Sequence, residues 1–272
     1  MSRTGADEAR STPPSAWHES QRRAGLHGTL REMAARGTHD KVVALLAQHS
    51  PPERAPDALD IGAGTGALSQ KLAEAGWRVA ACDLYPDAFA AQGIECRAVE
   101  DGRLPFPDAH FDVAIAVELL EHIEGHEGLF AEARRVLRPG GLLLMTTPNI
   151  LSLKSRVQFL LTGYPYSFPS LDPAELDPVA QHITPFSLDR YRWRLAQSGF
   201  DVETVDVDKL QSSSRALAFL IPLIRLATRK AARESASVRE QNSLRVLLGR
   251  KLFILARRRE DRRLDRPAAG AA

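Results

Sequence analysis

Cysteine is scarce in this sequence: only Cys82 and Cys96 occur among its 272 residues. Two cysteines without metal-ligand spacing argue against a disulfide framework, and they favour a reducing, cytoplasmic compartment. The N-terminal stretch is polar and lacks the apolar core of a signal peptide, so we do not expect secretion. The longest apolar run, over 216–227, is roughly half the ~20 residues that cross a bilayer, so we expect no transmembrane helix.

An excess of charge of one sign is lacking as well. The formal net charge is +2, which gives no general reason to expect a nucleic-acid partner, and the aromatic and basic surface that an RNA enzyme needs is absent. The charge is unevenly placed, however. From Arg215 to the end there are fifteen Lys and Arg against five Asp and Glu. We expect no nucleic-acid partner.

Apolar residues are plentiful, at 44 % of the chain, and from residue 58 onward they form short runs that alternate with amphipathic helical segments such as 68–75 and 129–136. Alternation of this kind predicts an α/β fold with a mostly parallel sheet and helices on both faces. Ligands of such sheets bind at the carboxyl ends of the strands. The seven expected strands cover 58–61, 78–82, 94–98, 113–117, 142–146, 201–206 and 252–256.

The α/β pattern occupies residues 49–259 and is interrupted twice. One excursion covers 148–185 and the other, a helical insertion, covers 209–249; excursions of this length in a compact domain are usually functional. Before the domain, residues 1–48 predict a disordered start and a helical cap, broken at Gly37 into two helices with Thr38 as the N-cap of the second. Residues 260–272 predict a basic, disordered tail.

Glycines at 62, 64 and 66 directly follow the first expected strand. Such a turn lets the backbone approach a ligand at the start of a helix. Asp83 stands at the end of the next strand, where an acid can accept hydrogen bonds from both ribose hydroxyls. The stretch 62–67 also satisfies the dinucleotide pattern G-x-G-x-x-G/A, so an NAD(P)-binding oxidoreductase remains an alternative, as does a turn without a ligand.

Acidic residues favour S-adenosylmethionine (SAM) over a dinucleotide. Asp60 precedes the turn, where a carboxylate suits an amino group and would repel a pyrophosphate. After the third strand, Glu100 or Asp101 can accept a hydrogen bond from the adenine amine, while Leu104 packs on the ring. The sequence therefore predicts SAM as the cofactor.

Five blocks along the chain are similar to the class I SAM-dependent methyltransferases of the type 11/type 23 group, which includes the ubiquinone O-methyltransferases. They are LDIGAGTG, VAACDLYPD, LPFPDAHFDVAIAVELLEHI, LRPGGLLLMTTPN and SGFDVETV. The resemblance implies a Rossmann-like seven-stranded sheet. It also implies that Asp60, Gly62, Ala63, Gly64 and Gly66 hold the methionine end, Asp83 and Leu84 the ribose, Glu100 or Asp101 the adenine, and that Glu118 lies near the sulfonium. The usual "DA" pair is absent at 100–102, which leaves the adenine acid open.

A second group of polar residues follows the fourth expected strand: Glu118, Glu121 and His122, with His182 much later in the chain. They have a plain structural interpretation, in which Glu121 and His122 cap a helix and His182 docks the first excursion. In a second interpretation, His122 or His182 is a general base that deprotonates an acceptor hydroxyl, with Glu121 in a supporting role. In a third, all four hold a divalent metal, since the grouping resembles the Mg²⁺ site of the ubiquinone-type enzymes.

The acceptor is not fixed by these motifs. The excursion 148–185 is rich in apolar and aromatic residues and predicts a lid over the acceptor site. We expect methylation of an oxygen on a small-molecule, glycan or lipid-linked acceptor, with a non-catalytic SAM-binding module as another alternative. Residues 214–233 combine an apolar helix with Arg229, Lys230 and Arg233, a pattern typical of contact with an anionic membrane surface, or of a helix packed on the sheet or at a dimer interface.

Overall fold

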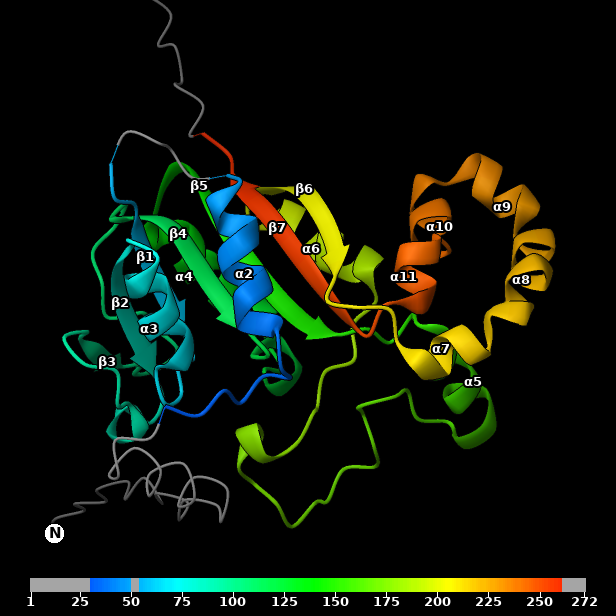
Figure 1. Ribbon diagram of the computed structural model, residues 1–272, viewed down its shortest axis with the longest axis horizontal. Helices are drawn as coiled ribbons and strands as arrows, with labels where there is room; N and C mark the ends of the chain where they lie inside the picture. The colour runs from blue at the N-terminus through cyan, green and yellow to red at the C-terminus, as the bar shows by residue number, and fades with distance from the viewer. Residues whose placement is uncertain (1–29, 50–53, 261–272) are drawn as a thin grey trace, which may run out of the picture.

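A single seven-stranded sheet forms the centre of the computed structural model, which describes residues 30–49 and 54–260. All seven expected strands are present, in the order β3-β2-β1-β4-β5-β7-β6 (Figure 1). Neighbouring strands are parallel from β3 to β5, and β7 runs antiparallel to both β5 and β6. The strands are β1 (Asp57–Ile61), β2 (Arg78–Asp83), β3 (Cys96–Ala98), β4 (Phe111–Val117), β5 (Leu137–Pro148), β6 (Phe200–Val207) and β7 (Lys251–Arg258).

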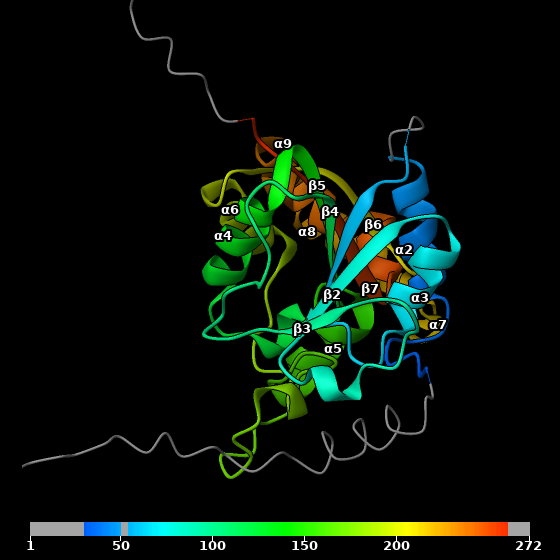
Figure 2. The ribbon, with the colours of Figure 1, turned by 90° about the vertical axis from the view of Figure 1, so that its left-hand side faces the viewer.

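Helices cover both faces of the sheet, as expected (Figure 2). On one face lie α2 (Thr38–Ala47) and α3 (Ala67–Glu74), and on the other lie α4 (His126–Val136) and α6 (Leu188–Gln197). Each helix buries apolar residues spaced three or four apart, because that spacing places them on one side of a helix. Examples are Val42, Leu45 and Leu46 in α2, Leu68 and Leu72 in α3, Phe130 and Ala133 in α4, and Leu188, Tyr191 and Leu195 in α6.

The expected helix before Gly37 is wrong for residues 30–36, which are not helical; its earlier part lies outside the described residues, as does most of the expected tail. The physical reason is an alternative partner for the backbone. The N–H of Arg31 donates to Thr65 Oγ1 over 3.1 Å, and that hydroxyl donates back to the carbonyl of Arg31 over 3.0 Å. Gly37, with φ 84°, is the N-cap of α2, so Thr38 is not; its hydroxyl donates to Ala35 O instead.

The insertion between β6 and β7 forms an arc of short helices beyond the β6 edge of the sheet (Figure 1). Its inner side packs on α5 (Leu153–Thr162), where Leu153, Ile221 and Leu247 form a small separate core. Asn149 at the end of β5 ties the insertion down, since its Nδ2 donates to the carbonyls of Val246 and Gly249. The elements of the arc are α7 (Ser212–Ala216), η4 (Ala218–Leu220), α8 (Ile221–Ala227), α9 (Arg229–Glu234), α10 (Ala236–Gln241) and α11 (Leu244–Leu248).

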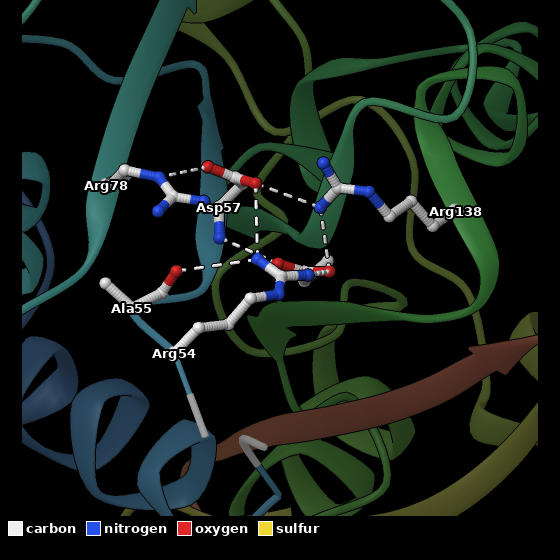
Figure 3. A network of polar contacts seen from close by, with 6 residues as sticks. Arg54, Ala55, Asp57, Arg78 and Arg138 are labelled. Carbon is white, nitrogen blue, oxygen red and sulfur yellow. Dashed lines mark hydrogen bonds and ion pairs between the residues drawn. The ribbon is translucent and has the colours of Figure 1, made fainter. Parts of the chain in front are cut away.

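An ion-pair network joins strands at the amino ends of the sheet (Figure 3). Asp57 at the start of β1 accepts from Arg78 Nε of β2 over 2.7 Å and from Arg138 Nη1 of β5 over 3.0 Å. Arg138 also reaches Asp112 of β4, and Arg54 pairs with the same carboxylate. The network therefore fixes β1, β2, β4 and β5 at the end of the sheet opposite to the ends where ligands bind.

Candidate active site

A cavity of about 840 Å³ opens at the carboxyl ends of the strands, where the sequence places the site. One end is formed by the glycine turn after β1 and by Asp83, and the other by the loop after β4, the lid 148–185 and the start of β7. A volume of this size is typical of small-molecule and cofactor sites. The cavity brings together residues from the whole length of the chain.

The glycine turn is held tightly against β2. The N–H groups of Gly62 and Ala63 both donate to Cys82 O, at 2.8 and 3.2 Å. Gly66, the N-cap of α3, has φ 85°, and a Cβ at this position would lie 2.8 Å from Ala91 Cβ. Since L-residues rarely adopt this conformation and no space is left for a side chain, only glycine fits there. The turn that the sequence predicts is thus the one observed.

Asp83, the last residue of β2, is bound to that turn. Its Oδ2 accepts from the N–H of Gly64 over 2.8 Å, and its Oδ1 accepts from the N–H of Tyr85 over 2.9 Å. A carboxylate has about four acceptor positions, so lone pairs remain for further donors. Leu84 also lines the cavity and is half exposed. Asp83 lies where an acid that binds ribose hydroxyls is expected.

Asp60 lies beneath the turn and is almost fully buried, 2 % exposed. Its Oδ2 accepts a 2.6 Å hydrogen bond from Ser69 Oγ of α3. Burial raises the pKa of this carboxyl to about 6, with a further rise from the Asp83 charge, because both outweigh the Ser69 hydrogen bond. Asp60 therefore titrates near neutrality and lines the cavity, as the candidate partner of a ligand's amino group.

The two acidic residues predicted to bind adenine do not line the cavity. Glu100 and Asp101 are exposed in a turn that is closed by a bridge between Glu100 and Arg103, and neither is among the residues that line the cavity. The cavity wall at this point is formed by Val99, Gly102 and the buried Leu104. Leu104 thus lines the cavity, while its contact with the adenine ring and the contact of either acid with the adenine amine stay predictions.

Glu118 follows β4 in the left-handed region, with φ 52°. Its carboxylate accepts from Thr146 Oγ1 over 2.9 Å and forms an ion pair with Lys251 at the start of β7. Lys251 is 7 % exposed and also lines the cavity. The pair holds Glu118 in the cavity wall. Sequence reasoning missed Lys251 because nothing near position 251 marks it as part of a site.

Glu121, His122 and His182 come together, as expected, although the two histidines are 60 positions apart in the sequence. Their potential ligand atoms all lie within 4.8 Å of one another, and the two imidazole rings meet edge to face at 4.8 Å between centroids. The N–H groups of Ile183 and Thr184 donate to Glu121 O, which clamps the lid to the loop after β4. Glu118 is not one of this group, since its carboxylate is bound to Lys251 and Thr146.

Both imidazoles have a defined orientation. Nδ1 of His122 lies 2.8 Å from Gln181 O, and Nδ1 of His182 lies 2.6 Å from Ser167 O. Because a carbonyl oxygen only accepts hydrogen bonds, Nδ1 is the donor in each ring, and Nε2 is the ring nitrogen turned away from these carbonyls. This is the arrangement of a metal-ligating or basic histidine, oriented by a backbone carbonyl.

Glu121 is fully buried, and neither carboxylate oxygen makes a hydrogen bond of full geometry with the described residues, although the Thr147 hydroxyl is near enough to lower its pKa. Burial raises the pKa of Glu121 well above its usual range, and the charge of Glu118 raises it further, while Lys251 and Thr147 oppose the shift. A buried carboxylate whose hydrogen bonds are incomplete is costly. Glu121 is therefore a candidate ligand of the cavity, together with the two histidines that lie beside it.

The N-terminal segment also lines the cavity, which sequence reasoning missed. Arg31, Met33, Ala34 and Ala35 cross over the glycine turn, and Met33 Sδ lies 3.3 Å from the position that a Cβ of Gly64 would occupy. His39 in the first turn of α2 faces the same cavity, is buried, and has an Nδ1 atom without a hydrogen-bond partner in the described chain. Burial lowers the pKa of His39, against the charge of Glu32, whose carboxylate lies 4.0 Å from Nδ1.

Comparison with known proteins agrees with this geometry. A family model described as "Methyltransferase domain" matches residues 29–205. A demethylmenaquinone methyltransferase of Tropheryma whipplei (strain Twist) is 29 % identical over 162 residues, which cover 53 % of this chain and 66 % of that protein. A ubiquinone biosynthesis O-methyltransferase of Xanthomonas oryzae pv. oryzae (strain PXO99A) is 32 % identical over 101 residues, 34 % of this chain and 42 % of that protein. The chain thus spans between about two fifths and two thirds of the length of these relatives.

Among solved structures, a SAM-dependent methyltransferase from Archaeoglobus fulgidus matches with a TM-score of 0.52 at 19 % identity, over 82 % of this chain and 96 % of that one. This likeness shows the shared fold. The family match covers most of the chain and contains the glycine turn, Asp83 and the Glu121–His122–His182 group. The chain belongs to the class I SAM-dependent methyltransferases, the family whose cofactor is SAM.

Proposed function

We propose that this protein transfers the methyl group of SAM to a hydroxyl oxygen of a small-molecule, glycan or lipid-linked acceptor. The observation that carries the proposal is the Glu121–His122–His182 group at the end of the cavity opposite to the glycine turn. SAM supplies a methyl group already activated by its sulfonium, and the chain has to align the acceptor, exclude water and manage one proton. The family match favours this activity over NAD(P)-linked oxidation.

The residues at the first end of the cavity suit the cofactor. Asp60 accepts hydrogen bonds from the amino group of the methionine end, and Asp83 accepts them from the ribose hydroxyls. The N-terminal segment over the glycine turn, with Met33 against Gly64, excludes water from the methionine end. Glu118, held by Lys251, lies between the two ends.

The Glu121–His122–His182 group fits a divalent cation. Nε2 of each imidazole and the buried carboxylate of Glu121 would supply three ligands, and both rings are oriented through Nδ1 as in metal sites. Two imidazoles with one carboxylate favour Mn²⁺ or a similar nitrogen-binding ion over Mg²⁺, which prefers oxygen ligands. Such an ion would lower the pKa of an acceptor hydroxyl. In its absence, the same Nε2 atoms accept the hydroxyl proton directly.

Transfer of labelled methyl groups from SAM into separated lipid, glycan and small-molecule fractions of a cell extract tests the activity. We expect label in one fraction, alkali-stable as an ether, and roughly 100-fold less with His182→Ala. His110→Ala is the matched control, because His110 is an exposed histidine outside the cavity. SAM binding without transfer to any fraction would instead identify a non-catalytic SAM-binding module.

The role of the metal is separable from the activity itself. Loss of activity in EDTA, with recovery on addition of Mn²⁺, is expected of the cation site. Calorimetry with Mn²⁺ alone gives a second readout, and Glu121→Gln should abolish the binding heat. Activity retained in EDTA would contradict the cation site and assign the two imidazoles the role of base.

A further inference from the structure

The most exposed apolar side chains of the described chain gather on α5 and on the η4–α8 segment. Among the described residues, Leu176 of the lid is the one other large apolar side chain that is as exposed, at 72 %. Figure 1 shows α5 and α7 next to each other at the end of the molecule beyond β6 and β7, and the small core around Leu153 and Ile221 joins α5 to α8. The exposed apolar side chains of these two segments, called the outer apolar surface below, are Phe159, Leu160 and Leu161 of α5 and Phe219, Leu223 and Leu226 of the η4–α8 segment, each between 57 and 82 % exposed.

The η4–α8 segment is apolar on two sides. Leu217, Ile221 and Ile224, spaced four and three residues apart, pack inward on the small core. Phe219, Leu223 and Leu226 have the same spacing two residues later, which places them on the opposite side. A helix needs one apolar side to pack on its own protein. The second side is covered by none of the described residues and therefore indicates a surface for a partner outside them.

Cations without partners flank the outer apolar surface. Arg215, Arg225, Arg229, Lys230 and Arg233 are all exposed, and none of their side chains makes an ion pair or hydrogen bond with the described residues. No acidic residue stands between positions 212 and 233. Elsewhere many arginines pair with carboxylates, as Arg192 does with Glu240 and Arg257 with Glu203. The flank therefore offers free positive charge to an anionic partner.

We propose that the outer apolar surface and its basic flank bind the surface of an anionic phospholipid bilayer, with Phe219, Leu223 and Leu226 entering the interface and the flanking cations contacting headgroups. Apolar residues beside lysine and arginine are the chemistry of such binding. A second copy of the chain fits less well, because a two-fold interface would set the same five cations against each other. The family match ends at residue 205, before this insertion begins, so the surface is additional to the matched domain.

Sedimentation of the full chain with vesicles tests the proposal without any measurement of activity. We expect binding to phosphatidylglycerol vesicles and far weaker binding to phosphatidylcholine vesicles. Each cation near an anionic surface contributes about fivefold, so R225A/K230A should bind roughly 25-fold less well. F219S/L223S/L226S should lose at least about tenfold. Because all five side chains are exposed, the variants should still fold, which binding of S-adenosylhomocysteine verifies.

Matched control variants distinguish vesicle binding by this surface from nonspecific electrostatic attraction and nonspecific hydrophobic adsorption. R36A/R190A removes two exposed cations elsewhere, and L176S removes an equally exposed leucine of the lid; both should bind vesicles like the unmodified protein. Failure of the unmodified protein to bind phosphatidylglycerol vesicles, or equal binding by the surface variants, would overturn the proposal. A third result would also overturn it: the unmodified protein forms a concentration-dependent dimer and does not bind vesicles, and F219S/L223S/L226S abolishes the dimer. A second copy of the chain would then occupy the surface.

Discussion

Gly64 donates its backbone N–H to the carboxylate of Asp83 over 2.8 Å, so the turn after β1 and the acid at the end of β2 hold each other in place. Asp83 thus has two tasks: it shapes the turn from one side, and it offers its remaining lone pairs to the cavity. The pattern of glycines and a later acid predicts the second task. Only the fold shows the first.

Replacement of Asp83 should therefore damage both the turn and the binding of SAM. Asp83→Ala removes the acceptor of the Gly64 N–H and the two hydrogen bonds expected to the ribose hydroxyls, each worth about 1.5–3 kcal/mol with a charged acceptor. We expect SAM affinity, measured by calorimetry, to fall at least about 100-fold. Asp83→Asn keeps one acceptor oxygen and should bind with intermediate affinity; unchanged affinity in Asp83→Ala would refute the assignment of Asp83 to the cofactor.

Asp60 should cost the protein stability at neutral pH. The pKa of this buried carboxyl is about 6 in the folded chain, above its usual value, so the folded state binds its proton more tightly than the unfolded chain does. Its contribution is therefore most favourable below about pH 4 and is lost as the pH rises through 6. Asp60→Asn keeps an acceptor for Ser69 without the charge. We expect it to be more stable at pH 7 by about 2–3 kcal/mol in urea unfolding, with weaker SAM binding.

The same variant tests the link between stability and function at this position. The stability gain of Asp60→Asn should vanish near pH 4, where the carboxyl of the unmodified protein is neutral in the folded state. A gain that stays constant between pH 4 and pH 7 would show that charge burial is not its origin. Equal SAM affinity in the two proteins would remove Asp60 from the cofactor site.

Local patterns explain why the sheet was predictable. Runs such as 113–117 and 142–146 are apolar and short, and their alternation with amphipathic helices leaves few other architectures. The turn after β1 was predictable for the same reason, because Gly62, Gly64 and Gly66 lie within five residues. The meeting of Glu121, His122 and His182 depended on family resemblance, since no local pattern joins residues so far apart.

Contacts between distant segments account for what the sequence did not reveal. Helical spacing around Leu30 and Met33 predicts a helix, yet the Thr65 hydroxyl binds the backbone of Arg31 and holds this segment across the cavity instead. Lys251 enters the site only because β7 inserts between β5 and β6. Glu100 and Asp101 are carboxylates that suit the adenine amine, but they lie in an exposed turn. The residue type alone does not say whether a side chain lines the cavity.

The network at the amino ends of the strands should control acid stability. Arg78 and Arg138 lower the pKa of Asp57 to about 2, against the effect of burial (Figure 3). A lowered pKa means that the stabilisation is complete above about pH 4 and is lost as the pH falls through 2. Asp57→Asn should reduce the free energy of unfolding at pH 7 by about 1–2 kcal/mol. It should also make the fall of this free energy at low pH less steep. Methyl transfer by the folded variant should not change, because the network is at the opposite end from the cavity.

A surface pair supplies the control for that prediction. Glu95 pairs with Arg97 at the surface, where solvent weakens the ion pair, so Glu95→Gln should change the stability and its fall at low pH far less than Asp57→Asn does. Equal losses from the two variants would show that the position of Asp57 between β1, β2 and β5 has no special effect.

Gly66→Ala should be far more damaging than the same change at Gly76. Both glycines have left-handed backbones, with φ 85° and 90°, but a Cβ at Gly66 would lie 2.8 Å from Ala91 Cβ and from the Phe89 ring, whereas none of the atoms around Gly76 lies within 4 Å. Backbone strain alone costs about 1 kcal/mol, and overpacking adds about 1–3 kcal/mol. We expect losses of about 1 kcal/mol for Gly76→Ala and about 2–4 kcal/mol for Gly66→Ala in urea unfolding. Because Gly66 closes the turn that lines the cavity, a shift of the turn away from Ala91 should also lower SAM affinity in Gly66→Ala. Equal effects at the two positions would mean that the contact with Phe89 and Ala91 does not constrain the turn.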